Sequence, residues 1–396
     1  MATVRSRPDA PLVTLTALGL LAISLFLQHA FATRQALLFL IGTGLGITLF
    51  HASFGFTGGW RRFVRKRRGA SVRAQLMLLA LTSLLFFPIL GNLFPQINVS
   101  AALGPVSLSV LVGAFLFGAG MQLGGGCGSG TLFTVGGGQV RMLITLSFFI
   151  AGTLLGTAHL PWWLALPNLG KLSVIDALGW MPALLIQVLV LGALYLLVAA
   201  LERRRHGTTE SLGVTGQHLP FSERLLFGPW TLWWGVAGLA VLSLLTLLVA
   251  GHPWSITFAF GLWGAKIWMA LGGDVSTWPY WSSGYPAVAL NRSVLADTTS
   301  LMDFGIILGA VLAAGLAGRF APPGRLKRNA VLTAVLGGLL LGYGARLAFG
   351  CNIGGMLAGI VSGSIHGWLW LVAGFLGSML GVRLRALFGL DPPRGT

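Results

Sequence analysis

The sequence predicts an all-α, polytopic membrane protein, and three observations lead to this fold class. Hydrophobic residues make up 55% of the 396 residues and charged residues only 9%, and the mean hydropathy is +0.83, which lies well outside the usage of soluble domains. Many apolar runs reach the roughly 20 residues that a helix needs to cross a bilayer. These runs do not alternate at period two, so helices are predicted rather than a barrel.

Eleven apolar segments are placed as helices along the chain. The 58 glycines are about twice the usual share of roughly 7%. In lipid, such small residues let helices approach closely, and they permit broken helices and re-entrant segments inside the protein. In chain order the segments are 11–31, 36–54, 74–94, 102–122, 141–160, 179–201, 231–250, 255–272, 300–318, 329–349 and 367–388.

The first segment has the features of a secretion signal as well as those of a helix. A basic arm precedes the apolar run Pro11–Leu27, and Ala30–Ala32 resembles a cleavage site. The apolar run is long for a signal peptide. We therefore expect an uncleaved first helix.

Basic residues cluster beside the apolar segments. The net charge is +17, and 20 of the 26 Lys and Arg residues fall into five clusters. This placement follows the positive-inside rule, so the clusters and both termini are expected in the cytoplasm. It argues against nucleic acid as a partner and for membrane lipid. The clusters are Arg5 with Arg7, Arg61–Arg73, Arg203–Arg224, Arg319–Arg328 and Arg383–Arg394.

The only long polar stretch divides the chain into two membrane halves. The first half is 1–201 and the second is 231–396, with a cytoplasmic linker at 202–230. Each half holds one of the two cysteines, Cys127 and Cys351. We expect the two halves to be separate units of one membrane bundle.

The charge pattern gives the two cysteine units opposite orientations. With the basic clusters inside, helix 102–122 runs inward and helix 329–349 runs outward. Segment 255–272 is followed by no basic cluster until Arg319, so it is expected to enter and leave by the same face.

The two units also match in sequence at a constant offset of 224. Seven identities fall within 18 positions, and five of them are glycines. Matching segments of opposite orientation predict an inverted, pseudo-two-fold repeat with short re-entrant broken helices, and a site where the halves meet. The matched residues are Gly113, Gly118, Gly120, Leu123, Gly126, Cys127 and Gly130, with Gly337, Gly342, Gly344, Leu347, Gly350, Cys351 and Gly354.

Three motifs, Leu116–Leu132, Pro253–Lys266 and Leu339–Trp370, resemble the YeeE/YedE family of membrane sulfur-compound transporters. The resemblance implies an hourglass-like bundle and uptake of thiosulfate across the bacterial inner membrane, past cysteine thiols. It also implies a cytoplasmic sulfur-carrier partner of the TusA type, whose acidic surface could meet the basic loops. Family members often carry a third cysteine in a Cys-Phe-Thr-Gly motif, where this chain has Gly55.

Both cysteines lie among glycines, Cys127 in GGGCGSG and Cys351 in AFGCNIGG. A thiol is a weak donor and a soft acceptor, so it suits weak contact with the terminal sulfur of thiosulfate, which conduction through successive sites requires. The glycines let backbone N–H groups point at the ion, and a helix that restarts after each cysteine would favour an anion. A single buried cysteine would more often be an ordinary core residue. Two cysteines in matched, glycine-rich settings favour a functional role instead.

The predicted substrate-binding set comprises the cysteines, their neighbours, two threonines of the motifs and two basic residues. Lys266 and Arg346 are the basic residues most expected to face the interior. Snorkelling explains Lys266 equally well, and it is the preferred explanation for Arg346, which lies near a helix end. Two cysteines 224 positions apart give no metal-ligand spacing, and no cofactor is expected. The set is Cys127, Cys351, Gly126, Gly128, Ser129, Gly350, Asn352, Thr57, Thr257, Lys266 and Arg346.

Two alternative functions stay open. The same fold could transport another sulfur or selenium species, or one cysteine could form a persulfide in a membrane sulfurtransferase. The latter needs a base near a cysteine, and the nearest histidine in the sequence is His366, so a permease is expected and not an enzyme. Only Asp303 of nine acidic residues lies well within a predicted span, so no carboxylate ladder for cations or protons is predicted.

Overall fold

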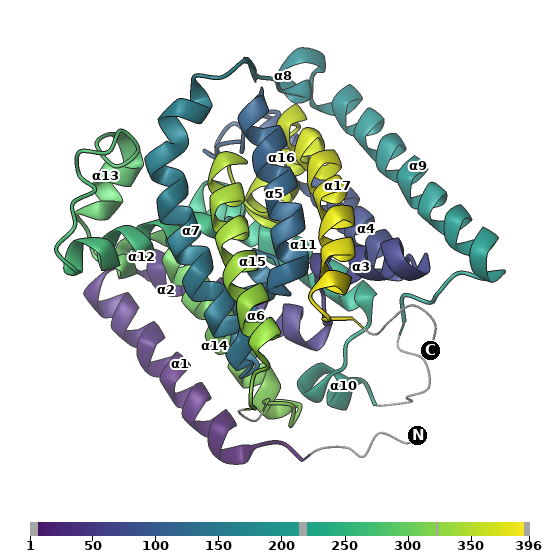
Figure 1. Cartoon of the computed structure of the whole chain (residues 1–396), viewed down its shortest axis with the longest axis horizontal. Helices are drawn as coiled ribbons and strands as arrows, with labels where there is room; N and C mark the ends of the chain where they lie inside the picture. The colour runs from purple at the N-terminus through teal and green to yellow at the C-terminus, as the bar shows by residue number, and fades with distance from the viewer. Residues whose placement is uncertain (1–6, 214–219, 322–323, 392–396) are drawn as a thin grey trace.

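The computed structural model describes residues 7–213, 220–321 and 324–391, and it is almost entirely helical (Figure 1). In these residues, ten helical segments are long and apolar enough to cross a membrane, which confirms the predicted fold class. Each of the eleven predicted segments coincides with a helix. The long helices are α1 (Ala10–Ala30), α2 (Thr33–His51), α4 (Ala70–Leu90), α5 (Leu108–Gly124), α7 (Val140–Leu164), α9 (Trp180–His206), α11 (Leu232–Ala250), α14 (Thr298–Leu316), α15 (Arg328–Leu347) and α17 (Ile365–Leu387).

Shorter elements connect and interrupt these helices. The strands β1 (Pro105–Ser107) and β2 (Asn168–Lys171) pair antiparallel. The short helices are α3 (Phe56–Lys66), α6 (Gly128–Gly136), α8 (Val174–Leu178), α10 (Phe221–Phe227), α12 (Thr257–Ala270), α13 (Gly284–Leu290) and α16 (Ala358–Val361), with a 3-10 turn η1 (Val294–Ala296) and a π-helical turn η2 (Asn352–Leu357).

The start of the fourth predicted segment, which corresponds to α5, was wrong. The segment was placed at 102–122, but α5 begins at Leu108. Residues 105–107 instead pair with β2, and the side chain of Ser107 accepts a hydrogen bond from the amide of Val110 at 3.3 Å. A serine at this position satisfies one of the free amides of the first turn, so the helix starts after it.

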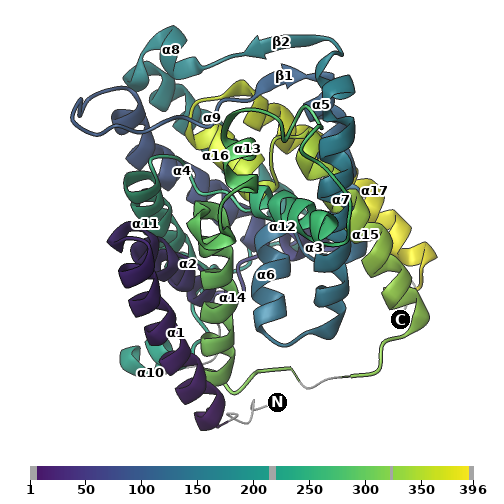
Figure 2. The same cartoon turned by 90° about the vertical axis from the view of Figure 1, so that its left-hand side faces the viewer.

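The basic clusters meet at one end of the molecule, called here the basic end. Arg73 and Glu202 form a buried ion pair with 3.0 Å between Nη2 and Oε2, and Arg65 lies 2.9 Å from Asp391. The amide of Asp9 bonds a carbonyl at the end of α14, so both described ends of the chain lie here. Figure 2 shows the start of α1 and α10 at this end, and β1 and β2 at the opposite end. That the basic end faces the cytoplasm stays a prediction.

The division into two halves at a polar linker also stays a prediction. The described linker residues include α10 and lie at the basic end, where Glu210 pairs with Arg62. Linker residues 214–219, and the basic residues Arg5 and Arg394, lie outside the described residues.

Two spanning segments are broken where the cysteines lie. α5 comes from the opposite end and stops at Gly125, whose φ of 98° suits glycine. After Cys127 the chain resumes as α6 and reaches Ala321 at the basic end. α15 runs the other way, and after Cys351 the chain continues as η2 and α16 to the opposite end, where Ser362 accepts an amide hydrogen bond from the loop before α5. Each broken helix therefore crosses the whole molecule.

The helices α3 and α12 enter the interior and return to the end from which they came. After α2 ends at the basic end, the chain turns inward at Ser53, whose φ is 47°, and α3 runs back out. On the other side the chain turns inward after Gly251, and α12 runs back to the opposite end. The sequence predicted that segment 255–272 would enter and leave by the same face, and α12 does return to the end from which the chain entered. It did not predict α3.

Glycines let α5 and α15 meet backbone to backbone. A Cβ on Gly113 would lie 2.8 Å from the carbonyl oxygen of Gly344, and a Cβ on Gly120 would lie 3.0 Å from that of Gly337. The two helices are antiparallel, and these contacts are reciprocal between residues matched at the offset of 224. Reciprocal contacts are what a two-fold axis between the two helices requires. That the complete halves form an inverted repeat stays a prediction.

Candidate functional site

Cys127 caps the N-terminus of α6. Its Sγ accepts a hydrogen bond from the N–H of Gly130 at 3.4 Å and lies 3.5 Å from Oγ of Ser129. The backbone amide of Phe56, at the start of α3, also approaches the sulfur. The side chain is fully buried. The thiol therefore lies where the N-termini of two helices meet.

Cys351 occupies the equivalent position in the second unit. Both cysteines have φ of −86° and ψ of −165°, and Sγ of Cys351 accepts a hydrogen bond from the N–H of Ile353 at 3.4 Å. The sharp turn before it uses Gly350, whose φ is 147°, a region closed to most residues. Trp370 holds this turn through a hydrogen bond to the Gly350 carbonyl at 3.1 Å. The predicted helix restart after each cysteine is thus confirmed.

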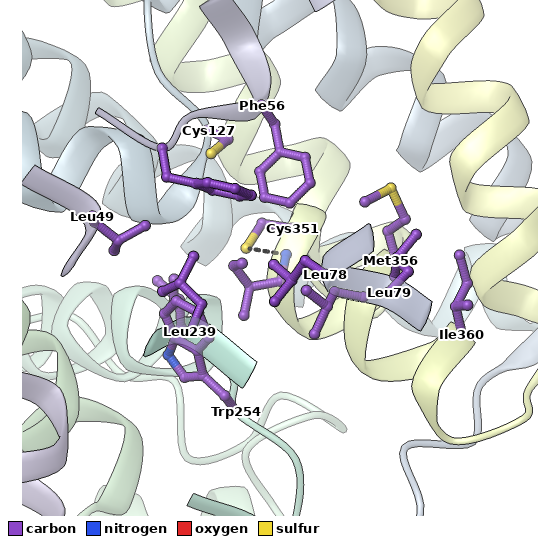
Figure 3. Close-up of a cluster of buried hydrophobic side chains, with 14 of the residues drawn as sticks. Leu49, Phe56, Leu78, Leu79, Cys127, Leu239, Trp254, Cys351, Met356 and Ile360 are labelled. Atoms are coloured by element: carbon purple, nitrogen blue, oxygen red, sulfur yellow. Dashed lines mark hydrogen bonds between the residues drawn. The ribbon is translucent and has the colours of Figure 1, made fainter. Parts of the chain in front are cut away.

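Gly128 brings the two cysteine units together. A Cβ on Gly128 would lie 2.8 Å from Sγ of Cys351 and 3.5 Å from the side chain of Ile256, which precedes α12. Figure 3 shows Cys127, Cys351 and Phe56 in one buried cluster. The N-termini of α3, α6 and α12 therefore approach one small region that holds both thiols.

A cavity extends from the basic end to Cys127. Its volume is about 240 Å³, and Gly55, Thr57 and Arg62 line it together with the cysteine. An adjoining cavity of about 260 Å³ shares part of this lining and includes Arg319. Among the described residues that line the two cavities there is no carboxylate. The charged side chains that line this approach are therefore basic, although Arg62 is also paired with Glu210, which is not part of the lining.

Several buried polar atoms near the cysteines lack a hydrogen-bond partner within the described part of the chain. They are Oγ1 of Thr57, Nε1 of Trp254 and both polar side-chain atoms of Asn352. Buried polar groups in folded proteins are almost always hydrogen-bonded. Such atoms are expected where a polar ligand is bound.

Most of the predicted site residues are brought together by the fold. Gly126 lines the cavity beside Cys127. Thr57 lies in the first turn of α3 and Thr257 in the first turn of α12, and both side chains are buried. The other predicted residues beside the cysteines lie within two positions of one of them in the chain, and they are Gly128, Ser129, Gly350 and Asn352.

Lys266 and Arg346 do not share this arrangement. Nζ of Lys266 donates to the carbonyls of Leu290 at 2.8 Å and Arg292 at 2.7 Å. Arg346 donates to the hydroxyl of Tyr280, and its guanidinium lies 4.6 Å from the centre of that ring. Both cations are held by other partners toward the opposite end. The arginines that line the two cavities are instead Arg62 and Arg319.

Sequence reasoning missed three groups of the site. Arg62 and Arg319 were counted only as loop charges, although both line the cavities. Trp254 was not singled out, although its indole lies in the same buried cluster as the cysteines. The signal for Trp254 was its place in the motif that begins at Pro253, directly before the turn into α12.

The neighbours of the two thiols give little basis for catalysis. The hydrogen-bond partners of the two sulfurs are backbone amides and a serine hydroxyl. His366 is held elsewhere, because its Nδ1 accepts a hydrogen bond from the Gly104 amide at 3.1 Å and lies 2.7 Å from Oγ of Ser364. Among the described residues, no group of His, Cys, Asp or Glu is arranged to hold a metal ion.

The sulphur transport family matches residues 51–380, a stretch that holds both cysteine units. The chain belongs to the sulphur transport family. The re-entrant helices α3 and α12 and both broken spans also lie within the matched stretch. The site described above is therefore built from the part of the chain that defines the sulphur transport family.

Named relatives agree with membership of the sulphur transport family. The thiosulfate transporter TsuA of Spirochaeta thermophila is 28% identical, over 86% of this chain and 95% of that protein. TsuA of Escherichia coli is 24% identical, over 85% and 90%. The probable transporter YedE of Escherichia coli is 30% identical over 38% of this chain, and the match spans only 37% of its length. These names describe transporters and not enzymes, as does the description of the family to which the chain belongs.

Proposed function

We propose that the protein imports thiosulfate across the bacterial inner membrane, and that the ion passes both cysteines by weak contacts. The observation that carries the proposal is the convergence of Cys127 and Cys351 with the N-termini of α3, α6 and α12. Two relatives that align with most of the chain are named thiosulfate transporters, and this supports the choice of ion.

The charges around the site suit a dianion. A helix N-terminus carries the equivalent of about half a positive charge, and its free amides bind anions. Arg62 and Arg319 line the approach from the basic end, where positive charge raises the local concentration of anions. The terminal sulfur would contact the thiols, while the oxygens would accept hydrogen bonds from the amides, Thr57, Asn352 and Trp254.

Thiols suit the transfer because their contacts are weak. A thiol is a poor donor and a polarizable acceptor, so it can recognise a sulfur atom without holding it. Conduction requires sites that bind well enough to admit the ion and weakly enough to release it. Cys127 and Cys351 would serve as two such sites in series.

The proposal places the basic end in the cytoplasm. The exposed Arg203–Arg205 at the end of α9 lie there, and they would offer a docking surface to an acidic sulfur-carrier protein of the TusA type. Transfer of the ion to such a carrier would lower the concentration of free ion at the cytoplasmic side and so favour import.

A sulfurtransferase mechanism has less support. A persulfide enzyme needs a base that activates its thiol, and the described contacts of both sulfurs are amides and one hydroxyl. Transport of another sulfur or selenium species by the same site is separated from thiosulfate transport by competition in the experiment below.

The test is uptake of labelled thiosulfate by cells that lack other sulfate and thiosulfate importers. We expect uptake by the wild type, and loss of most of it in Cys127→Ala and in Cys351→Ala. Ser243→Ala is the control, because Ser243 is buried in α11 and its hydroxyl has no partner among the described residues. Absence of wild-type uptake with the protein present in the membrane would refute thiosulfate as substrate. Where uptake is seen and depends on both cysteines, competition by unlabelled selenium and sulfur oxyanions ranks the alternative substrates.

A further inference from the structure

Asp303 is a buried carboxyl group that the pathway described above does not use. It lies in α14 and has no exposed surface. Neither of its oxygens accepts a hydrogen bond from any residue that the structure describes. A buried carboxylate without partners is strongly unfavourable, and an acidic residue inside a membrane segment is commonly functional.

Asp303 faces the centre of the protein. One turn earlier, Ser300 accepts a hydrogen bond from Trp263 of α12 at 2.9 Å. One turn later, the carbonyl of Ile307 lies against α6. Residues three and four apart share a helix face, so the carboxyl group lies toward α6 and α12, whose N-termini meet at Cys351. This places the carboxyl group on the side of α14 that faces the cysteine units.

No cation among the described residues offsets this carboxyl group. None of the ion pairs found there includes Asp303. The neighbouring Asp297 adds a second negative charge, and its own carboxylate accepts hydrogen bonds from the Tyr285 hydroxyl and the Ser300 amide, both at 2.7 Å. The field at Asp303 therefore opposes a further negative charge.

The other titratable groups on the elements packed against α14 have partners or positions elsewhere. On α2, Arg34 bonds carbonyls at the opposite end, and His51 lies against Trp230 at the basic end. On α12, Lys266 bonds two carbonyls. α6 carries no titratable residue. The remaining groups lie at the ends of α1 and on α10, and they are Asp9, His29, Glu223 and Arg224.

We propose that Asp303 binds a proton together with the transported anion, so that anion and proton enter the cell together. This inference rests on the thiosulfate transport proposed above. A dianion at Cys351 and an ionised Asp303 would repel each other strongly in a medium of low dielectric. The protonated carboxyl removes that repulsion and offers an O–H donor.

Coupling follows from this mutual dependence. If the bound anion raises the affinity of Asp303 for the proton, the bound proton raises the affinity of the site for the anion by the same factor. When the anion leaves toward the basic end, the field that held the proton is lost and the proton can follow. The inward proton gradient would then drive uptake.

The test uses the purified full-length protein in liposomes with labelled thiosulfate. One proton and one dianion carry a net charge of −1, so the membrane potential is held at zero with potassium and an ionophore. For one proton per anion, an imposed pH difference of one unit, alkaline inside, should then raise the steady-state accumulation ratio about tenfold. A pH dye inside the liposomes should show acidification when thiosulfate is added outside. Asp303→Asn should lose both effects but still exchange labelled for unlabelled thiosulfate at equal pH. Asp297→Asn is the matched control and should keep the coupling.

Each outcome bears on a different claim. A wild type that transports thiosulfate without acidification, and without response to the pH difference, overturns the inference and leaves the proposed function standing. A wild type that transports no thiosulfate overturns the proposed function itself. Coupling that persists in Asp303→Asn, and in Asp303→Ser as a second neutral variant, assigns the proton to another group.

Discussion

Gly128 and Cys351 touch across the two cysteine units, since a Cβ carbon on residue 128 would lie 2.8 Å from Sγ of Cys351. Side chains in folded proteins essentially never come so close. Residue 128 must therefore be glycine if the thiol is to keep its position. Gly128, which follows Cys127 in the chain, thus fixes the position of the Cys351 thiol.

Gly128→Ala should lower both stability and transport. Overpacking by one methyl group in a tight core costs about 1–3 kcal/mol, and the displaced thiol would no longer line the path. Thermal unfolding of the purified protein and thiosulfate uptake measure the two effects. Adding Cys351→Ala removes the sulfur atom and should restore most of the lost stability but no transport. If the double variant is as unstable as Gly128→Ala, the contact is not the cause.

Thr57→Val should weaken substrate binding without weakening the fold. The Thr57 hydroxyl is buried beside the cavity and has no partner among the described residues, so its removal breaks no hydrogen bond of the protein. A hydrogen bond to a charged group contributes about 1.5–3 kcal/mol, which corresponds to a rise in the KM of roughly tenfold or more. Thr82→Val is the control, because the Thr82 hydroxyl is also buried and unpartnered but lies in α4, outside the cavities. Equal effects of both variants would argue against direct contact.

Gly55→Cys should place a reactive thiol in the cavity. A Cβ on Gly55 meets no atom within 4 Å, and its φ of −139° suits any residue. We expect a membrane-impermeant maleimide to label this variant in inside-out vesicles, while the buried Cys127 and Cys351 of the parent react slowly. Leu169→Cys, in the exposed strand at the opposite end, should react only in intact spheroplasts. The reverse pattern would place the basic end outside the cell.

Asp391→Asn should destabilise the basic end in a pH-dependent way. Partial burial alone would raise the pKa of Asp391, but Arg385, Arg65 and Arg61 hold it below its ordinary value of 3.8. A carboxylate with a lowered pKa stabilises the fold above that ordinary value, and this contribution is lost as the pH falls through the folded-state pKa. We expect a loss of about 1–2 kcal/mol at neutral pH, seen as a lower melting temperature. Well below pH 3.8 the melting temperatures of the variant and the wild type should converge. A difference in melting temperature that is the same at every pH would point to packing instead.

The sequence predicted the helices well because lipid demands long apolar runs, and such runs are visible without any tertiary information. It failed at α3, which is short and carries arginines on one face, so it read as part of a cytoplasmic loop. Its position depends on a turn at Ser53 that returns the chain to the interior. Hydropathy does not report such a turn.

The sequence predicted only part of the candidate site, namely the part that appears as a pattern along the chain. The paired glycine-rich settings of Cys127 and Cys351 were visible because the spacing repeats along the chain. Lys266 was chosen for its charge alone, and the structure shows its ammonium group bound to two carbonyls. Which cations face a cavity depends on tertiary packing, and so Arg62 and Arg319 could not be selected from the chain.

The backbone contacts between α5 and α15 limit the motions available to the transporter. Gly113 and Gly120 meet the opposing helix with no side chain between. Sliding α5 by one turn, about 5.4 Å along the axis, would bring Leu116 or Phe117 to the place of Gly113 against that backbone. We therefore expect this helix pair to stay fixed while the proposed transport takes place. We expect the openings that admit and release the ion to be local, made by α3, α6, α12 and η2, as in a gated channel and not as in two bundles that rock past each other.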